Sequence, residues 1–216
     1  MAIDVGIKNL AICIMSRTTE GYKVIYWKCL SVLEPRKCPG VQKNGVICNK
    51  ICSVRSIVNQ ETYCKRHIPA GHRTRRYQPK SEMTWHNIAN GIHHTLNVER
   101  AEWPEAIDTC LIELQPKINQ RMKFVSHIIF GYMASTNLPK TLKFVRASKK
   151  LKAYKGPEPI VANGVSAYKR RKNLAVKHVE YFLDTTVCGG GLDHEFRTVT
   201  KKDDLSDAFL MAYQGF

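Results

Sequence analysis

The chain has 216 residues, enough for one well-buried domain with an insertion, whereas two full domains would each be small. It carries 34 Lys and Arg against 18 Asp and Glu, a formal net charge of +16. An excess of this size predicts a polyanionic partner, and nucleic acid fits best. No apolar run approaches the roughly 18 residues of a membrane span, and no secretory leader is evident, so we expect no membrane association and no secretion by that route.

The predicted elements, in chain order, give an α/β layout. Short apolar segments at residues 2–6, 10–15 and 22–33 predict three antiparallel strands. Beyond residue 34 the apolar periodicity gives way to Pro, Gly, Cys and basic residues, which predicts an insertion at 36–78 within a single domain spanning 1–216. Apolar spacing then predicts helices at 81–100, 119–134, 165–183 and 202–213, with strands at 110–114 and 142–146.

Several of the few carboxylates stand where burial is costly. Asp4 lies within the first apolar strand and Glu113 within the strand 110–114. Asp203, Asp204 and Asp207 open the last helix, where residues three or four apart share one face. A charge in an apolar strand needs a partner, so we expect these carboxylates to hold a divalent cation such as Mg²⁺. Two such ions about 4 Å apart can hold the attacking and leaving oxygens of a phosphodiester displacement.

Three motifs together resemble those of the RuvC-like Holliday junction resolvases, members of the RNase H-like superfamily. In family order they are Ile3-Asp4-Val5-Gly6, Ile112-Glu113-Leu114-Gln115-Pro116 and Lys202-Asp203-Asp204-Leu205-Ser206-Asp207. Within that superfamily, the glutamine after the central glutamate makes this motif similar to that of the poxvirus-type viral resolvases. The resemblance implies an RNase H-like α/β fold, a mixed five-stranded sheet flanked by helices, with a small zinc-binding insertion. Only three residues precede Asp4, so the first strand is short for the family, and whether the start is truncated stays open.

By this resemblance, Asp4, Glu113, Asp204 and Asp207 are catalytic ligands of two Mg²⁺ or Mn²⁺ ions. Asp203 is the alternative to Asp204, because it lies four residues from Asp207. The resemblance also implies a structure-selective endonuclease that resolves four-way DNA junctions by paired nicks, as a homodimer, in viral DNA replication, recombination or packaging. Two alternatives stay open: an RNase H-like nuclease acting on RNA:DNA hybrids or flaps, and a non-catalytic, zinc-stabilised DNA-binding factor.

Basic stretches are the candidates for DNA contact, because phosphate contacts dominate affinity for DNA. The helix 165–183 has one cationic side, to which Lys177 and His178 add further along. A second stretch covers residues 140–155, and a third follows the cysteines of the insertion. The residues expected to bind nucleic acid are Lys169, Arg170, Arg171, Lys172, Lys149, Lys150, Arg75 and Arg76. Lys169 and Lys172 are also candidates for stabilising charge in the transition state.

The insertion contains four of the eight cysteines. Cys38, Cys48, Cys64 and His67 form the pattern C-x9-C-x15-C-x2-H, which predicts one structural Zn²⁺ with four tetrahedral ligands. Cys52 is the alternative to Cys38, since its spacing of C-x3-C from Cys48 is closer to a conventional zinc knuckle. Clustered thiols of this kind are typical of a reducing compartment, so we expect an intracellular protein.

Overall fold

The computed structural model describes residues 1–19, 21–77, 83–146, 150–151, 154, 156–157, 164, 166–185, 187–188, 192–199 and 201–215. The chain divides into two compact units: unit 1 contains residues 1–32 and 91–216, and unit 2 contains residues 33–90. Unit 2 is therefore wider than the insertion 36–78, because it continues into helix α1 (Trp85–Glu99). No helix among the described residues is long and apolar enough to cross a membrane.

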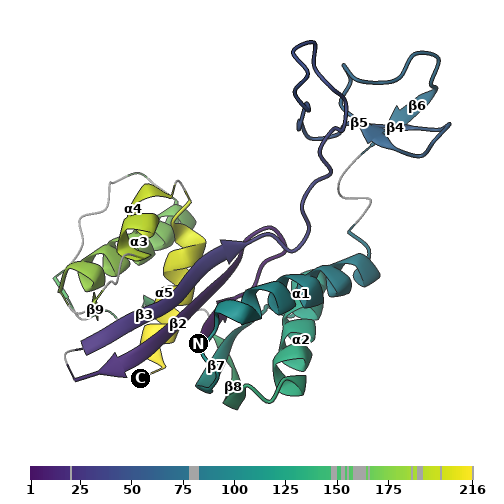
Figure 1. Ribbon diagram of the computed structural model, residues 1–216. Helices are drawn as coiled ribbons and strands as arrows, with labels where there is room; N and C mark the ends of the chain where they lie inside the picture. The colour runs from purple at the N-terminus through teal and green to yellow at the C-terminus, as the bar shows by residue number, and fades with distance from the viewer. Residues whose placement is uncertain are drawn as a thin grey trace. The chain divides into compact units, whose positions relative to one another are not determined.

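Unit 1 is built on a mixed sheet with the strand order β8-β7-β1-β2-β3-β9 (Figure 1). The first three strands form an antiparallel meander, while β7 pairs with β1 and β8 pairs with β7 in parallel. Five of the strands are those predicted: β1 (Ala2–Asp4), β2 (Leu10–Thr18), β3 (Gly21–Leu30), β7 (Ile107–Leu114) and β8 (Pro139–Arg146). The sixth, β9 (Val187–Cys188), is a two-residue strand parallel to β3 that the sequence did not indicate.

One face of the sheet is covered by α5 (Asp203–Gln214), α3 (Ala167–Thr185) and α4 (Leu192–Thr198) (Figure 1). Trp27 of β3 stacks on Phe196 of α4 with ring centroids 4.6 Å apart, and its indole nitrogen donates to the Leu205 carbonyl at 3.0 Å. Phe209 of α5 is fully buried between Trp27 and Phe182. Burying one such ring contributes roughly 1.5–3 kcal/mol, so this aromatic cluster fixes α5 against the sheet.

The opposite face receives the alternate side chains of the same strands. Ile3 and Ile112 are fully buried and, because strand side chains alternate, point away from α5. Helix α2 (Gln120–Ser135) packs on β7 and β8 from this side. The Tyr132 hydroxyl of α2 donates to the Asn97 side chain of α1 at 2.8 Å, which ties the two helices together. A short 3-10 helix (Arg100–Glu102) follows α1.

Unit 2 contains a three-stranded antiparallel sheet of order β5-β4-β6, formed by β4 (Val54–Ser56), β5 (Thr62–Tyr63) and β6 (Thr74–Arg76). Before this sheet, the chain forms an irregular hairpin in which Lys37 pairs with Ile51 and Val41 pairs with Ile47. Both segments are too short and too rich in turns to bury much apolar surface by themselves.

Candidate functional site

Two neighbouring strands bring the strand carboxylates to one place. In the parallel pairing of β1 with β7, Ile3 lies opposite Ile112, so Asp4 and Glu113 follow side by side at the ends of their paired segments. Both share the α5-facing side of the sheet with Ala2 and Leu111, because side chains alternate along a strand. A tight turn follows Asp4 at Gly6, where a Cβ atom would lie 2.2 Å from the Asn9 carbonyl oxygen. The Asp-x-Gly spacing therefore has a steric reason.

Lys150 occupies the space between the carboxylates. Its Nζ atom lies 2.6 Å from Asp4 Oδ1, 2.9 Å from Glu113 Oε1 and 3.2 Å from Asp207 Oδ2. The Lys150 side chain is only 5% exposed. Three carboxylates from β1, β7 and α5 thus converge on a single cation.

This ion cluster sets the protonation of its members. Burial raises the pKa of Asp4 well above its usual range and also raises the pKa of Asp207, although Lys150 opposes both shifts. Burial acts in the same direction on Glu113, but the Lys150 ammonium outweighs it and the pKa of Glu113 lies below its usual value. Burial would lower the pKa of Lys150, yet the carboxylates around it raise that pKa above its ordinary value. Lys150 therefore remains charged and compensates the buried acids.

Glu113 has a second partner that the sequence did not single out for this role. The Gln115 side-chain nitrogen donates to Glu113 Oε2 at 2.7 Å, while the other carboxylate oxygen faces Lys150. Residues two apart on a strand point to the same side, which is the only sequence signal for this contact. Gln115 consequently fixes the orientation of the glutamate.

The first two turns of α5 contribute the helical carboxylates. Asp204 and Asp207, three residues apart, line one open cavity together with Asp4 and Glu113. Asp204 Oδ2 pairs with Lys201 Nζ at 2.7 Å. Asp203 is not among the cavity residues and instead pairs with Lys172. The structure thus brings together the four carboxylates expected from the motifs, with Asp204 rather than its neighbour in the third place.

Helix α3 supplies a basic wall to the same cavity, whose volume is about 470 Å³. Tyr168, Arg171 and Lys172 line it, because residues three and four apart lie on one helical face. Lys172 Nζ lies 3.9 Å from Asp204 Oδ1 and 5.1 Å from the centre of the Tyr168 ring. Lys169 and Arg170 are exposed and are not among the residues that line the cavity.

Two basic residues that the sequence suggested for DNA contact are buried, and a third lies outside the described residues. Lys150, expected on an exposed basic stretch, is buried against the carboxylates, since these acids need a counter-charge where water is excluded. His178 is buried and stacks on Tyr154 at 3.8 Å, and burial lowers its pKa, so it does not extend the cationic side of α3. Lys149 lies outside the described residues.

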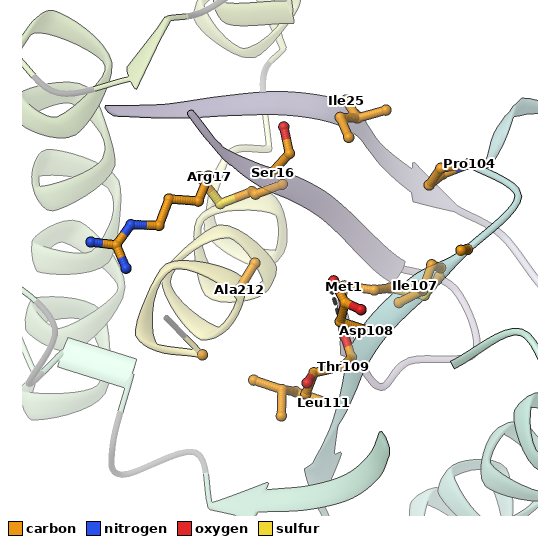
Figure 2. Close-up of a pocket in the computed structure, with 13 residues that line it drawn as sticks. Met1, Ser16, Arg17, Ile25, Pro104, Ile107, Asp108, Thr109, Leu111 and Ala212 are labelled. Carbon is orange, nitrogen blue, oxygen red and sulfur yellow. Dashed lines mark hydrogen bonds between the residues drawn. The ribbon is translucent and has the colours of Figure 1, made fainter. Parts of the chain in front are cut away.

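A second cavity of unit 1, of about 440 Å³, lies at the other ends of β7 and α5 (Figure 2). Met1, Ile107, Leu111 and Ala212 line it together with polar residues such as Ser16, Arg17 and Thr109. Its single carboxylate, Asp108, is exposed and pairs with Lys140 at 2.6 Å. This cavity has no convergent acidic group, so the candidate for chemistry is the cavity around Lys150.

In unit 2, the side chains of Cys38, Cys48, Cys64 and His67 converge, with their ligand atoms all within 4.8 Å of one another. The distances are 3.8 Å from Cys48 Sγ to Cys64 Sγ, 3.7 Å from Cys38 Sγ to His67 Nδ1, and 3.5 Å from Cys64 Sγ to His67 Nδ1. A tetrahedral zinc with Zn–S bonds of about 2.3 Å and a Zn–N bond of about 2.0–2.1 Å requires S···S near 3.8 Å and S···N near 3.5 Å. The observed spacing therefore fits zinc.

The surroundings of this cluster favour a metal as well. The buried cluster at this site consists of four cysteines, Tyr63 and Tyr77, whereas six aliphatic side chains of the unit are more than half exposed: Val41, Val46, Ile47, Ile51, Ile57 and Val58. His67 packs directly on Gly40, where a Cβ atom would lie 2.4 Å from the histidine Cβ. Cys52 is buried in the same cluster, but its sulfur is not among the four convergent ligand atoms.

No protein-family model and no curated protein matches this sequence. Among solved structures, the chain is similar to the yeast mitochondrial Holliday junction resolvase Ydc2, with a TM-score of 0.50 and 15% identity over 98% of this chain and 74% of that one. The chain has the RNase H-like fold. At this identity the likeness establishes the fold alone, and the fold expected from the motifs is confirmed.

Two further solved structures are similar over nearly the whole chain. They are the fowlpox virus resolvase with its Holliday junction DNA, at 14% identity, a TM-score of 0.46 and complete coverage of both chains, and the T. thermophilus RuvC in complex with a Holliday junction substrate, at 11% identity, a TM-score of 0.46 and coverage of 99% and 92%. These scores are too low to add to the fold assignment.

Proposed function

We propose that this protein is a metal-dependent endonuclease that cuts four-way DNA junctions. The observation that carries the proposal is the cavity of unit 1, in which four carboxylates face a basic helix. Carboxylates that can hold divalent cations and basic side chains that can hold phosphate are the two parts of a metal-assisted site for phosphodiester hydrolysis.

The donor set fits the proposed ions. Mg²⁺ and Mn²⁺ prefer oxygen ligands, and Asp4, Glu113, Asp204 and Asp207 offer only oxygens. The proposal is supported by Lys150 Nζ, a positively charged group that lies between three of them. When bound, two divalent ions would supply an activated water and neutralise charge on the leaving oxygen.

The chain's own residues supply orientation and charge. Gln115 holds one Glu113 oxygen, which leaves the other directed into the cavity. Arg171 and Lys172 on the cavity wall would hold the scissile phosphate and stabilise its charge in the transition state. With divalent ions held by the carboxylates, the Lys150 ammonium would pair with the scissile phosphate in the same cavity.

The choice of a junction as substrate is supported by the solved structures with this fold, since the yeast protein is named a Holliday junction resolvase. A four-way junction has two-fold symmetry, so paired nicks need two active sites and we propose a homodimer. The proposed zinc site requires reduced thiols, in keeping with an intracellular and reducing setting. A role in viral DNA replication, recombination or packaging belongs to the same proposal and stems from the motif resemblance.

The test is cleavage of a synthetic four-way junction, an RNA:DNA hybrid and a flapped duplex by the full chain in Mg²⁺. Paired symmetric nicks in the junction, reduced at least roughly a hundredfold in Asp4→Asn, are the expected result. The matched control is Asp108→Asn, the same change at an exposed carboxylate at the other end of the sheet. Preferential cutting of the hybrid or the flap would contradict the junction as the substrate. Binding without cleavage would contradict the enzyme assignment and favour a DNA-binding factor.

A further inference from the structure

Tyr168 is an aromatic residue on the wall of the cavity that contains the four carboxylates, which we call the cleavage cavity. It is the second residue of α3 and is 60% exposed. Of the phenylalanines, tyrosines and tryptophans that the structure describes, only Tyr168 and Trp85 are exposed. Burial in the core therefore does not explain an aromatic ring at this place.

The sequence of α3 explains why this ring faces the cavity. Tyr168, Lys172, Ala175, Val179 and Phe182 follow one another at spacings of four, three, four and three residues, which is a single stripe along a helix. The last three are buried in the core of unit 1. The stripe that packs on the sheet thus continues beyond the core, where Tyr168 and Lys172 line the cleavage cavity instead.

Charged side chains surround the ring. Lys172 Nζ lies over it, 5.1 Å from its centre, in a cation–π contact that restricts the orientation of the ring. Arg171, about one turn from Tyr168, lines the same cavity. In the proposed function Arg171 and Lys172 hold the scissile phosphate, so a nucleotide bound there has an exposed aromatic ring beside it.

We propose that Tyr168 stacks on an unstacked base next to the scissile phosphate and thereby favours branched DNA over duplex. That the substrate is DNA rests on the proposed function. Every base has a π face, so stacking on an aromatic side chain tolerates any sequence. A base within a duplex must first leave its stack, which costs free energy, whereas at a branch point the stack is already interrupted. The ring therefore adds affinity for a branched substrate and little for a duplex.

The test uses the full chain carrying Asp4→Asn as the parent, so that DNA is bound without being cut. Tyr168→Leu removes the ring and keeps an apolar side chain, while Tyr168→Phe keeps the ring. The matched control is Trp85→Leu, which removes an exposed aromatic residue that is not among those lining the cleavage cavity. Affinity for a four-way junction and for a plain duplex is measured by fluorescence anisotropy from low to high salt.

A second measurement detects the stacking itself. Iodouracil replaces thymine next to the branch point of the junction, one position at a time, because on irradiation it crosslinks to an aromatic side chain stacked on it. Mass spectrometry then locates the crosslinked residue. We expect crosslinks at residue 168 in the parent and in Tyr168→Phe.

Tyr168→Leu should bind the junction roughly 5- to 150-fold more weakly than the parent, the range for loss of one stack between a base and an aromatic ring, and the duplex within about twofold of it. Tyr168→Phe and Trp85→Leu should both bind the junction within about twofold of the parent. The slope of log affinity against log salt should stay within about half a unit of the parent slope in all three variants, because no phosphate contact is removed.

A Tyr168→Leu variant that binds the junction as the parent does would overturn the proposal, as would an equal loss on the duplex or the absence of any crosslink at residue 168. A slope shallower by about 1 unit in Tyr168→Leu would overturn it too, because the ring would then act through a phosphate contact of Lys172. A loss as large in Trp85→Leu would contradict a role specific to the cavity.

The outcome is separable from that of the proposed function. If the chain with wild-type Asp4 does not cut junctions but the effect of Tyr168→Leu on junction binding and the crosslink persist, the enzyme assignment fails and the base contact stands. If cutting occurs and neither the effect nor the crosslink is found, the base contact fails alone.

Discussion

Replacing Lys150 by methionine tests whether its ammonium group occupies the cavity between the carboxylates of unit 1. Methionine keeps an unbranched, flexible stem but removes the ammonium group that lies within 3.2 Å of three carboxylates. The carboxylates of Asp4, Glu113 and Asp207 would then share a buried site with no counter-charge from this position. We expect the protein without added Mg²⁺ to lose stability and to bind Mg²⁺ more tightly.

The magnitude follows from the burial of the cluster. Removing one partner of a buried ion pair costs about 3–5 kcal/mol, and the Lys150 side chain is 5% exposed, so this range applies. In a chain of this size, 1 kcal/mol moves Tm by about 2–4 °C, which predicts a fall of roughly 6–20 °C. The control is Lys140→Met, since the Lys140–Asp108 pair has the same 2.6 Å distance as the Lys150–Asp4 pair but is exposed, and exposed pairs contribute at most about 1 kcal/mol.

The pH dependence has a defined sign. Lys150 opposes the burial that raises the pKa of Asp4 and Asp207, so its removal raises both values further. An acid whose pKa is higher in the folded state takes up its proton in the folded protein first, so stability rises as the pH falls through that pKa. The deficit of Lys150→Met relative to wild type should therefore be larger at pH 8 than at pH 5.

The assay combines thermal unfolding followed by circular dichroism with calorimetric titration of Mg²⁺, in buffer without added divalent ions or chelator. In the wild type, Mg²⁺ must displace the Lys150 ammonium, and this opposes metal binding. If that cost is half of a lost stability of about 3 kcal/mol, the Mg²⁺ dissociation constant falls at least roughly tenfold in the variant. Unchanged Tm together with unchanged Mg²⁺ affinity would refute the reasoning, because it would mean that the ammonium does not occupy the carboxylate site in solution.

Three further changes test other parts of the structure. Asp204→Asn should reduce cleavage of a junction at least roughly a hundredfold and Asp203→Asn by less than about tenfold, and initial rates in Mg²⁺ that rank the other way would transfer the ligand role to Asp203. Gly40→Ala should lower the zinc content, because the added Cβ would lie 2.4 Å from the His67 Cβ; retention of one zinc per chain by atomic absorption would contradict the placement of the histidine. Phe209→Ala should cost about 3–5 kcal/mol in urea unfolding, whereas exposed Tyr168→Ala should cost under about 1 kcal/mol, and equal losses would show that the aromatic cluster does not hold α5.

The strand carboxylates could be predicted from the sequence because their surroundings leave few choices. Asp4 and Glu113 each interrupt an apolar run, and burial of a charge there demands a partner or a cation. Parallel pairing of their strands then places them side by side. The sequence pattern therefore indicated which residues form the candidate site and which strands carry them.

The position of Lys150 could not be predicted in the same way. It belongs to a stretch with many lysines, and no local spacing distinguishes it from Lys140 and Lys143, which are exposed. Only the folded sheet and α5 together create the cluster of negative charge that binds one ammonium group in the interior. The two-residue strand β9 was missed for a related reason, since its pairing with β3 depends on tertiary contacts.

The choice between Cys38 and Cys52 shows what spacing alone omits. Conventional spacing favoured Cys52 as an alternative, but the backbone pairs the segment around Cys38 with that around Cys48. The Cys38 amide donates to the Lys50 carbonyl and the Cys48 amide donates to the Gly40 carbonyl, each at 2.8 Å. These bonds bring two cysteines ten residues apart across an antiparallel hairpin, which a count of intervening residues does not reveal.

The two proposed metal sites differ in what occupies them when the metal is removed. At the cysteine cluster, three distances between ligand atoms already match those of a zinc tetrahedron, and four cysteines form the buried cluster of unit 2 together with Tyr63 and Tyr77. At the cleavage cavity, Lys150 neutralises the carboxylates in place of an ion. The protein can therefore stay folded while Mg²⁺ exchanges, whereas loss of zinc should unfold unit 2. A chelator that removes only weakly held ions should accordingly stop cleavage while leaving one zinc per chain and unit 2 folded.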